Sequence, residues 1–290
     1  MLSHGLNTNA VKMTDLIKFY TSQGYDVLLT ILTGHDGNRK EFQNVTREKW
    51  IQDMYSTYCA AQAKANEEKL PLFFTGYSVS GLVVEDLIEN YPDQKVHFEK
   101  MILFAPAVAV KPITGLVKAL NVFGKDYMVP SFSNPEYRVC NGTPIEAYDS
   151  LFDSYNMLKK SDFSHSRQTP TLVIIDPKDE LVSTSGIRKI ISTKHLDNWS
   201  LVVVTNYAAT TKVKYHHFIV AEEAVGAHVW QQTLEAISAS LEGKSQPRST
   251  INNADICGKD GKLWKTPMND SCSDDTADGC DRSQNDCKPI

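Results

Sequence analysis

An α/β fold, with a mainly parallel β-sheet flanked by helices, is predicted by two features of this sequence. The first is a series of near-continuous apolar runs, as expected for strands that are covered on both faces. The second is the alternation of these runs with segments that carry one apolar stripe at helical spacing. Strands that alternate with helices in this way favour a parallel sheet. The expected strands are residues 27–32, 71–75, 101–105, 171–175 and 201–205.

Apolar stripes mark three of the expected helices. One stripe covers residues 50–59, a second covers residues 82–91, and the last covers residues 229–241 and ends at Gly243. A chain of 290 residues is long enough to bury a substantial core. We therefore expect one large domain, residues 1–243, followed by an appendage.

Composition narrows the classes of function. A hydrophobic content of 41% and a formal charge of -5 are typical of a globular protein with no basic surplus, which argues against nucleic acid as a partner. No apolar run approaches the roughly 20 residues that a membrane-spanning helix needs. No signal peptide is visible at the start of the chain. A monomer and a dimer are both compatible with these features.

Two regions interrupt the alternation of strands and helices. Residues 111–167 form a connection far longer than usual, and it mixes aromatic and aliphatic residues with Pro, Gly and Asn, which favours a lid. Residues 244–290 begin as a linker and continue as a cysteine-rich tail with few aliphatic residues. An even set of cysteines in such a tail indicates disulfides and a secreted or periplasmic location. These cysteines are Cys257, Cys272, Cys280 and Cys287.

The candidate nucleophile is Ser78. Residues 76–81 have the sequence Gly-Tyr-Ser-Val-Ser-Gly and lie between an apolar run and an amphipathic stripe, so they predict a sharp turn from strand to helix. Such a turn holds its central serine in a strained conformation and requires small residues two positions to either side. The strain exposes the serine hydroxyl at the end of the strand.

A serine hydroxyl needs a base to take its proton and a carboxylate to orient that base. In a parallel sheet, both groups are expected in loops at the carboxyl ends of strands. Residues 176–182 follow one expected strand and contain Asp176 and Asp179. The loop after residues 201–205 leads to His216 and His217.

The sequence resembles the α/β-hydrolase family, and among its members the lidded serine esterases and monoacylglycerol-lipase-like hydrolases. The resemblance covers residues 3–243 and rests on four features in the family's order: residues 3–6 (Ser-His-Gly-Leu), the turn at residues 76–81, Asp179 and His217. Fewer residues precede the His-Gly pair than in the family, so we expect either that the sequence is a fragment or that the sheet lacks the family's N-terminal strands. Ser80 stands where the family usually has glycine, and it is small enough for the turn.

The resemblance implies roles for particular residues. Ser78 would be the nucleophile and Asp179 the acid, since Asp176 ends its strand where the family usually has glycine. His217 would be the general base, because two apolar residues follow it, while His216 is the alternative. The backbone N–H groups of Leu6 and Val79 would form the oxyanion hole.

The resulting prediction is a serine hydrolase that cleaves carboxylic esters, including lipid-like acyl esters, through an acyl-enzyme, with no metal or organic cofactor. The same groups also serve thioesterases, peptidases and acyltransferases. A non-catalytic module that binds a lipid or a protein on this fold is the alternative, and a secreted interaction protein whose tail is the functional part is a further one. Apolar side chains in the expected lid could receive an acyl chain. They are Leu116, Leu120, Phe123, Tyr127, Met128, Phe132 and Tyr137.

Overall fold

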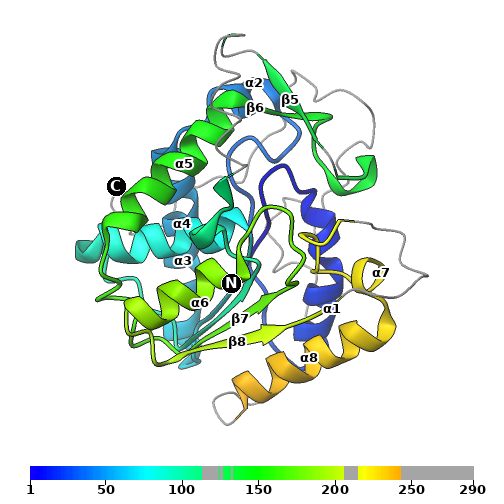
Figure 1. Cartoon of the computed structure of the whole chain (residues 1–290). Coiled ribbons are helices and arrows are strands. Elements are labelled where there is room, and N and C mark those ends of the chain that lie inside the picture. The colour runs from blue at the N-terminus through cyan, green and yellow to red at the C-terminus, as the bar shows by residue number, and fades with distance from the viewer. Residues whose placement is uncertain (113–123, 125–126, 132, 206–214, 243–290) are drawn as a thin grey trace.

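A computed structural model describes residues 1–112, 124, 127–131, 133–205 and 215–242 (Figure 1). In this part of the chain, six parallel strands form one sheet in the order β2-β1-β3-β4-β7-β8. The predicted α/β fold is therefore confirmed. The strands are β1 (Leu2–Ser3), β2 (Leu29–Thr30), β3 (Phe73–Tyr77), β4 (Lys100–Phe104), β7 (Thr171–Ile175) and β8 (Trp199–Val203).

Both ends of five of these strands lie within two residues of the ends of the predicted apolar runs. The exception is β1, which the sequence did not predict because two residues are too short to show a pattern. In the structure Leu2 pairs with Leu29 on one side and with Thr75 on the other. This pairing places the loop that follows β1 directly beside the end of β3.

Helices cover both faces of the sheet. Figure 1 shows α1 and α8 on one side and α3, α4 and α6 on the other. The central helix α4 carries the predicted stripe, with Leu82, Val83 and Leu87 fully buried against the core. The helices are α1 (Thr14–Ser22), α2 (Arg39–Gln43), α3 (Arg47–Glu68), α4 (Val79–Asn90), α5 (Ile145–Lys160), α6 (Thr184–Thr193), α7 (Glu222–Val225) and α8 (Ala227–Leu241).

The long connection at residues 111–167 contains elements of its own. Strands β5 (Met128–Pro130) and β6 (Gly142–Pro144) pair in antiparallel fashion, and α5 packs against α4. The ring of Tyr137 lies edge-on to Phe218, 4.6 Å between centroids, so this connection contacts the segment that follows His217. Of the residues expected to receive an acyl chain, Leu116, Leu120, Phe123 and Phe132 lie outside the described residues.

The linker and the tail, residues 244–290, also lie outside the described residues, together with their four cysteines. Of the two cysteines that the structure describes, Cys59 and Cys140, neither is a free thiol. Within the described ranges, no helix has both the length and the hydropathy to cross a membrane.

Candidate active site

Ser78 occupies the turn between β3 and α4. Its backbone has φ 55° and ψ -112°, a region that costs a non-glycine residue on the order of 1–3 kcal/mol. Two backbone hydrogen bonds hold this conformation: Ser78 N–H donates to the carbonyl of Phe104 at 2.9 Å, and Ala107 N–H donates to the carbonyl of Ser78 at 3.0 Å. The neighbouring strand β4 and the residues after it thus stabilise the strained turn.

The residues two positions before and after Ser78 must be small, as predicted. A Cβ atom on Gly76 would lie 2.6 Å from the ring of Phe74. On the other side, Ser80 is fully buried, and its hydroxyl lies 2.6 Å from Ser3 Oγ and donates to the carbonyl of His4. Ser80 therefore connects the turn to the loop after β1.

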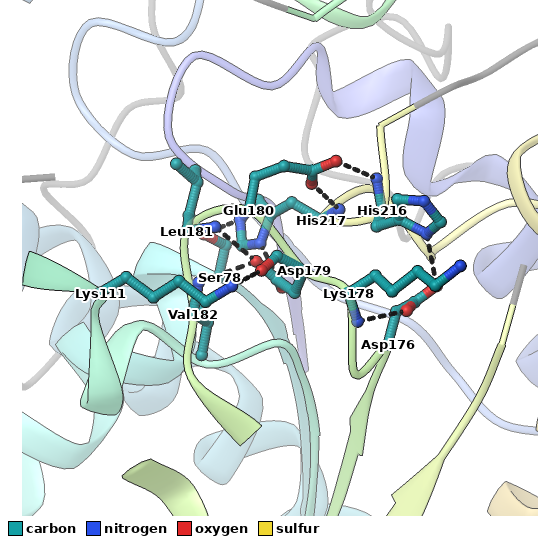
Figure 2. A network of polar contacts seen from close by, with 10 residues as sticks. All are labelled: Ser78, Lys111, Asp176, Lys178, Asp179, Glu180, Leu181, Val182, His216 and His217. Atoms are coloured by element: carbon teal, nitrogen blue, oxygen red, sulfur yellow. Dashed lines mark hydrogen bonds and ion pairs between the residues drawn. The ribbon is translucent and has the colours of Figure 1, made fainter. Parts of the chain in front are cut away.

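The structure brings Ser78, His217 and Asp179 together at the carboxyl end of the sheet (Figure 2). His217 Nε2 lies 2.8 Å from Ser78 Oγ, and His217 Nδ1 lies 2.7 Å from Asp179 Oδ2. All three residues are buried. Because Asp179 accepts the Nδ1 proton, the lone pair of Nε2 faces the serine hydroxyl, which is the orientation that a general base requires.

Asp179 is held as a carboxylate. Its Oδ1 accepts hydrogen bonds from the backbone N–H groups of Leu181 at 2.7 Å and Val182 at 2.8 Å. Burial raises the pKa of Asp179, but the charge and hydrogen bond of His217 and the two N–H groups outweigh this effect. The net pKa is below its ordinary value. The ammonium group of Lys111 donates to the backbone carbonyl of Asp179, which further fixes this loop.

His216, the alternative base, lies elsewhere. Its Nδ1–H donates to Asp176 Oδ2 at 2.9 Å, and its ring turns away from Ser78 (Figure 2). Asp176 in turn accepts from the N–H of Lys178 at 2.7 Å. The two aspartates of the loop after β7 therefore bind two different histidines, and only the pair of Asp179 and His217 reaches the serine.

The two N–H groups predicted for the oxyanion hole are available. Val79 N–H belongs to the first residue of α4, at the positive end of the helix dipole. Within the described residues, neither Val79 N–H nor Leu6 N–H donates to an acceptor. Val79 directly follows the nucleophile, and a donor with no acceptor at that position suits the negative oxygen of a tetrahedral intermediate.

Two buried histidines shape the loop that carries Leu6. His4 Nε2 accepts from Leu32 N–H at 3.2 Å, and His35 Nε2 accepts from Asn7 N–H at 2.9 Å. Burial lowers the pKa of His4 to about 4 and lowers the pKa of His35 well below its ordinary value. Both rings are therefore neutral at neutral pH, as their role as acceptors demands.

Sequence reasoning did not find three residues that support this site. Glu180 binds the backbone of both histidines, Lys111 binds the loop of Asp179, and the Asn7 side chain binds the backbone of Cys140. Each acts on a backbone group that only the folded chain brings near. The one local signal was the position of Glu180 next to the candidate acid.

The described residues include no group of three or more His, Cys, Asp or Glu side chains arranged to hold a metal ion.

The fold and the geometry of the site define an α/β hydrolase, and sequence comparison agrees. Residues 1–150 match the model of a family of such enzymes, Hydrolase_4, described as serine aminopeptidase, S33. The chain belongs to this family. A comparison with curated protein sequences finds no match.

Solved structures with the same fold include several lipases. The Saccharomyces cerevisiae monoglyceride lipase, solved as a soluble variant with a substrate analogue, is 10% identical with a TM-score of 0.64, covering 84% of this chain and 86% of its own. One of the metagenome-derived lipolytic enzymes LipS and LipT is 20% identical with a TM-score of 0.58, covering 82% and 90%. Monoacylglycerol lipase from Paleococcus ferrophilus is 17% identical with a TM-score of 0.55, covering 84% and 93%.

Proposed function

We propose that this protein is a serine hydrolase that cleaves carboxylic esters, with Ser78 as nucleophile, His217 as general base and Asp179 as the orienting acid. The observation that carries the proposal is the unbroken hydrogen-bond chain from Asp179 Oδ2 through the His217 ring to Ser78 Oγ. A serine is activated for attack when its proton has such an acceptor.

The reaction proceeds in two halves. His217 Nε2 takes the proton of Ser78 as Oγ attacks the ester carbonyl, and the N–H groups of Leu6 and Val79 stabilise the oxyanion. His217 then gives the proton to the departing alcohol, which leaves an acyl-enzyme on Ser78. A water molecule, deprotonated by His217, attacks the acyl carbon, and the carboxylic acid is released as Ser78 recovers its proton.

Lipid-like acyl esters are the proposed substrates. The long connection at residues 111–167 is rich in apolar and aromatic residues, and part of it, Tyr137, lies against the segment that follows His217. The structurally similar proteins named above are lipolytic enzymes or glyceride lipases. The family description names an aminopeptidase, so amide hydrolysis is the competing specificity.

Turnover of p-nitrophenyl esters of graded acyl length tests the proposal, with aminoacyl p-nitroanilides as the amide comparison. Ser78→Ala is expected to lower kcat by at least about 10³-fold. Ser22→Ala, an exposed serine on α1, is the matched control and should retain wild-type activity. A fluorophosphonate probe should label wild-type protein and not the Ser78→Ala variant. Folded wild-type protein that neither labels nor turns over any substrate would instead be a non-catalytic binding module.

A further inference from the structure

The loop after β7 presents three carboxylates to two consecutive histidines. Asp176 binds the side chain of His216, and Asp179 binds the side chain of His217. Glu180 binds neither ring. Its two oxygens accept the backbone N–H groups of both histidines instead, as Figure 2 shows.

The geometry of Glu180 is that of a two-point clamp. Oε1 lies 3.1 Å from His216 N and Oε2 lies 3.0 Å from His217 N. Hydrogen bonds from N–H groups to a carboxylate are roughly twice as strong as those between neutral groups. Two of them on adjacent residues fix both the position and the rotation of the backbone from which the His217 ring extends.

Glu180 and Asp179 divide the work of holding His217. Asp179 fixes the ring through Nδ1, and Glu180 fixes the backbone through the N–H group. Because Asp179 and Glu180 are adjacent in one short loop, the same segment of chain holds both the ring and the backbone of His217. A displacement of about 1 Å in such a site costs roughly 100-fold in rate.

We propose that Glu180 is a positioning residue for His217, and that its negative charge also favours the imidazolium that forms when His217 takes the proton of Ser78. This inference rests on the proposed function for its catalytic consequence. The positioning role follows from the two hydrogen bonds of Glu180 to the backbone and does not depend on the proposed function.

Two aromatic rings pack near the ring of His217, and both are uncharged at neutral pH. The rings of Tyr77 and Tyr215 lie 5.2 Å and 5.9 Å from the His217 ring, centroid to centroid. Burial foremost, together with nearby negative charge that includes Glu180, raises the pKa of both phenols, so neither carries charge at neutral pH.

The charged groups near His217 include Asp176, Lys178, Asp179 and Glu180 of the loop after β7, together with Lys111. Asp179 contacts the His217 ring directly, while Asp176 contacts His216. The ammonium group of Lys111 binds the backbone carbonyl of Asp179, and Lys178 belongs to the loop itself, where its backbone N–H donates to Asp176. Since Asp176 and Asp179 would still hold both histidine side chains, variants at Glu180 are expected to remain folded.

Two variants separate geometry from charge. Glu180→Gln keeps one acceptor oxygen and loses the charge, whereas Glu180→Ala loses both. With a p-nitrophenyl ester, Glu180→Ala is expected to lower kcat by about 10- to 100-fold and to change KM by less than about twofold. The kcat of Glu180→Gln is expected to fall between those of Glu180→Ala and wild type.

In both variants the acid limb of the profile of kcat/KM against pH should move to lower pH, because the imidazolium loses a favourable charge. Glu222→Gln removes an exposed acid five positions after His217 in the sequence and should leave kcat and the profile unchanged.

A spectroscopic readout keeps the inference testable apart from ester turnover. The low-field proton resonance of His217 Nδ1–H, assigned by its loss in His217→Gln, should broaden in Glu180→Ala and titrate at lower pH in both Glu180 variants. If wild-type protein hydrolyses no ester but this resonance responds as expected, the proposed function fails and the positioning role stands. If the resonance, kcat and the pH profile all match wild type in Glu180→Ala, the inference is wrong. A rise in KM alone would make Glu180 a substrate contact and would overturn it as well.

Discussion

The hydroxyl groups of Ser3 and Ser80 lie 2.6 Å apart, and this contact joins the nucleophile turn to the loop of the proposed oxyanion hole. The Ser80 hydroxyl also donates to the carbonyl of His4, two residues before Leu6. Ser80 stands where the α/β-hydrolase family usually has glycine, which has no side chain to make such a bond. The departure from the family pattern thus has a structural role.

Ser80→Ala should therefore affect both stability and catalysis. The change leaves the buried carbonyl of His4 without its hydroxyl partner, which costs about 1–3 kcal/mol of unfolding free energy. It also frees the backbone that aims Leu6 N–H, so kcat should fall by about tenfold while KM changes little. Urea unfolding and ester kinetics measure the two effects. Ser3→Ala, which spares the bond to His4, should show the smaller loss; equal effects of the two variants would contradict this account.

Asn7 couples the same loop to the long connection at residues 111–167. Its side chain accepts from Cys140 N–H at 2.9 Å and donates to Cys140 C=O at 2.9 Å, while its backbone has φ 50°. Asn7→Gly permits this φ without strain, so any loss reflects the missing side-chain bonds. We expect kcat to fall by about tenfold and a boronic acid, which mimics the tetrahedral intermediate, to bind more weakly.

The Asn7→Asp variant sharpens this test. It keeps the acceptor for Cys140 N–H, loses the donor to Cys140 C=O and buries a charge, so it should be less stable than Asn7→Gly. Wild-type kcat and wild-type boronic acid affinity in Asn7→Gly would show that the oxyanion loop keeps its position without Cys140.

The fold class could be predicted because its signals are local. Apolar runs and helical stripes are written in consecutive residues, and the small residues around Ser78 reflect the strain of a single turn. Strand β1 could not be found in this way, since Leu2 and Ser3 form a strand only through partners in β2 and β3. The prediction of a disulfide-bonded tail stays a prediction.

The same distinction applies to the candidate site: local sequence patterns predicted some of its residues, and only the fold revealed the others. Ser78, Asp179 and His217 were selected by motif and chain order, and the structure brings them within hydrogen-bond distance. The contacts of Glu180 and Asn7 depend on where backbone N–H and C=O groups of distant segments lie. No pattern of residue types records that, so only the folded chain reveals these residues.

Acid should weaken the fold through His4 and His35. Unfolded histidine has a pKa of about 6.5, whereas burial lowers the pKa of His4 to about 4 and also lowers the pKa of His35 well below its usual value. Between these values the unfolded chain binds more protons than the folded one. The contribution of these two histidines to the unfolding free energy is therefore fully present above about pH 6.5. It is lost as the pH falls, by roughly 3 kcal/mol for His4 at full effect.

Urea unfolding from pH 7 down to 4.5 measures this loss. In His35→Gln, an amide oxygen can still accept from Asn7 N–H but does not titrate in this range. As the pH falls, this variant should therefore gain stability relative to wild type, because it lacks the loss caused by His35 while the contribution of Glu85 is the same in both proteins. Parallel curves would mean that His35 contributes nothing to the acid sensitivity.

Glu85 on α4 should have the opposite pH dependence. Its side chain is fully buried, and among the described residues its carboxyl oxygens make no hydrogen bond of ordinary length and angle, although the Ser166 hydroxyl is close enough to act on its charge. Burial raises the pKa of Glu85 to about 8; the Ser166 hydroxyl opposes this shift and the charge of Glu89 adds to it. Since unfolded glutamate titrates near 4.3, the folded state binds the extra proton between about pH 4.3 and 8. The contribution of Glu85 to the unfolding free energy is fully present below that window and falls across it as the pH rises, by several kcal/mol in all.

Glu85→Gln removes the titrating proton and keeps the size of the side chain. Relative to wild type, its unfolding free energy should rise steadily between pH 5 and 8, because only wild type loses the contribution of Glu85 there, whereas the contributions of His4 and His35 are common to both proteins. Thermal or urea unfolding at several pH values measures the difference. Glu67→Gln, at an exposed position on α3, is the matched control and should follow the wild-type curve. A wild-type slope that survives in Glu85→Gln would show that Glu85 is already ionised in the folded protein at neutral pH.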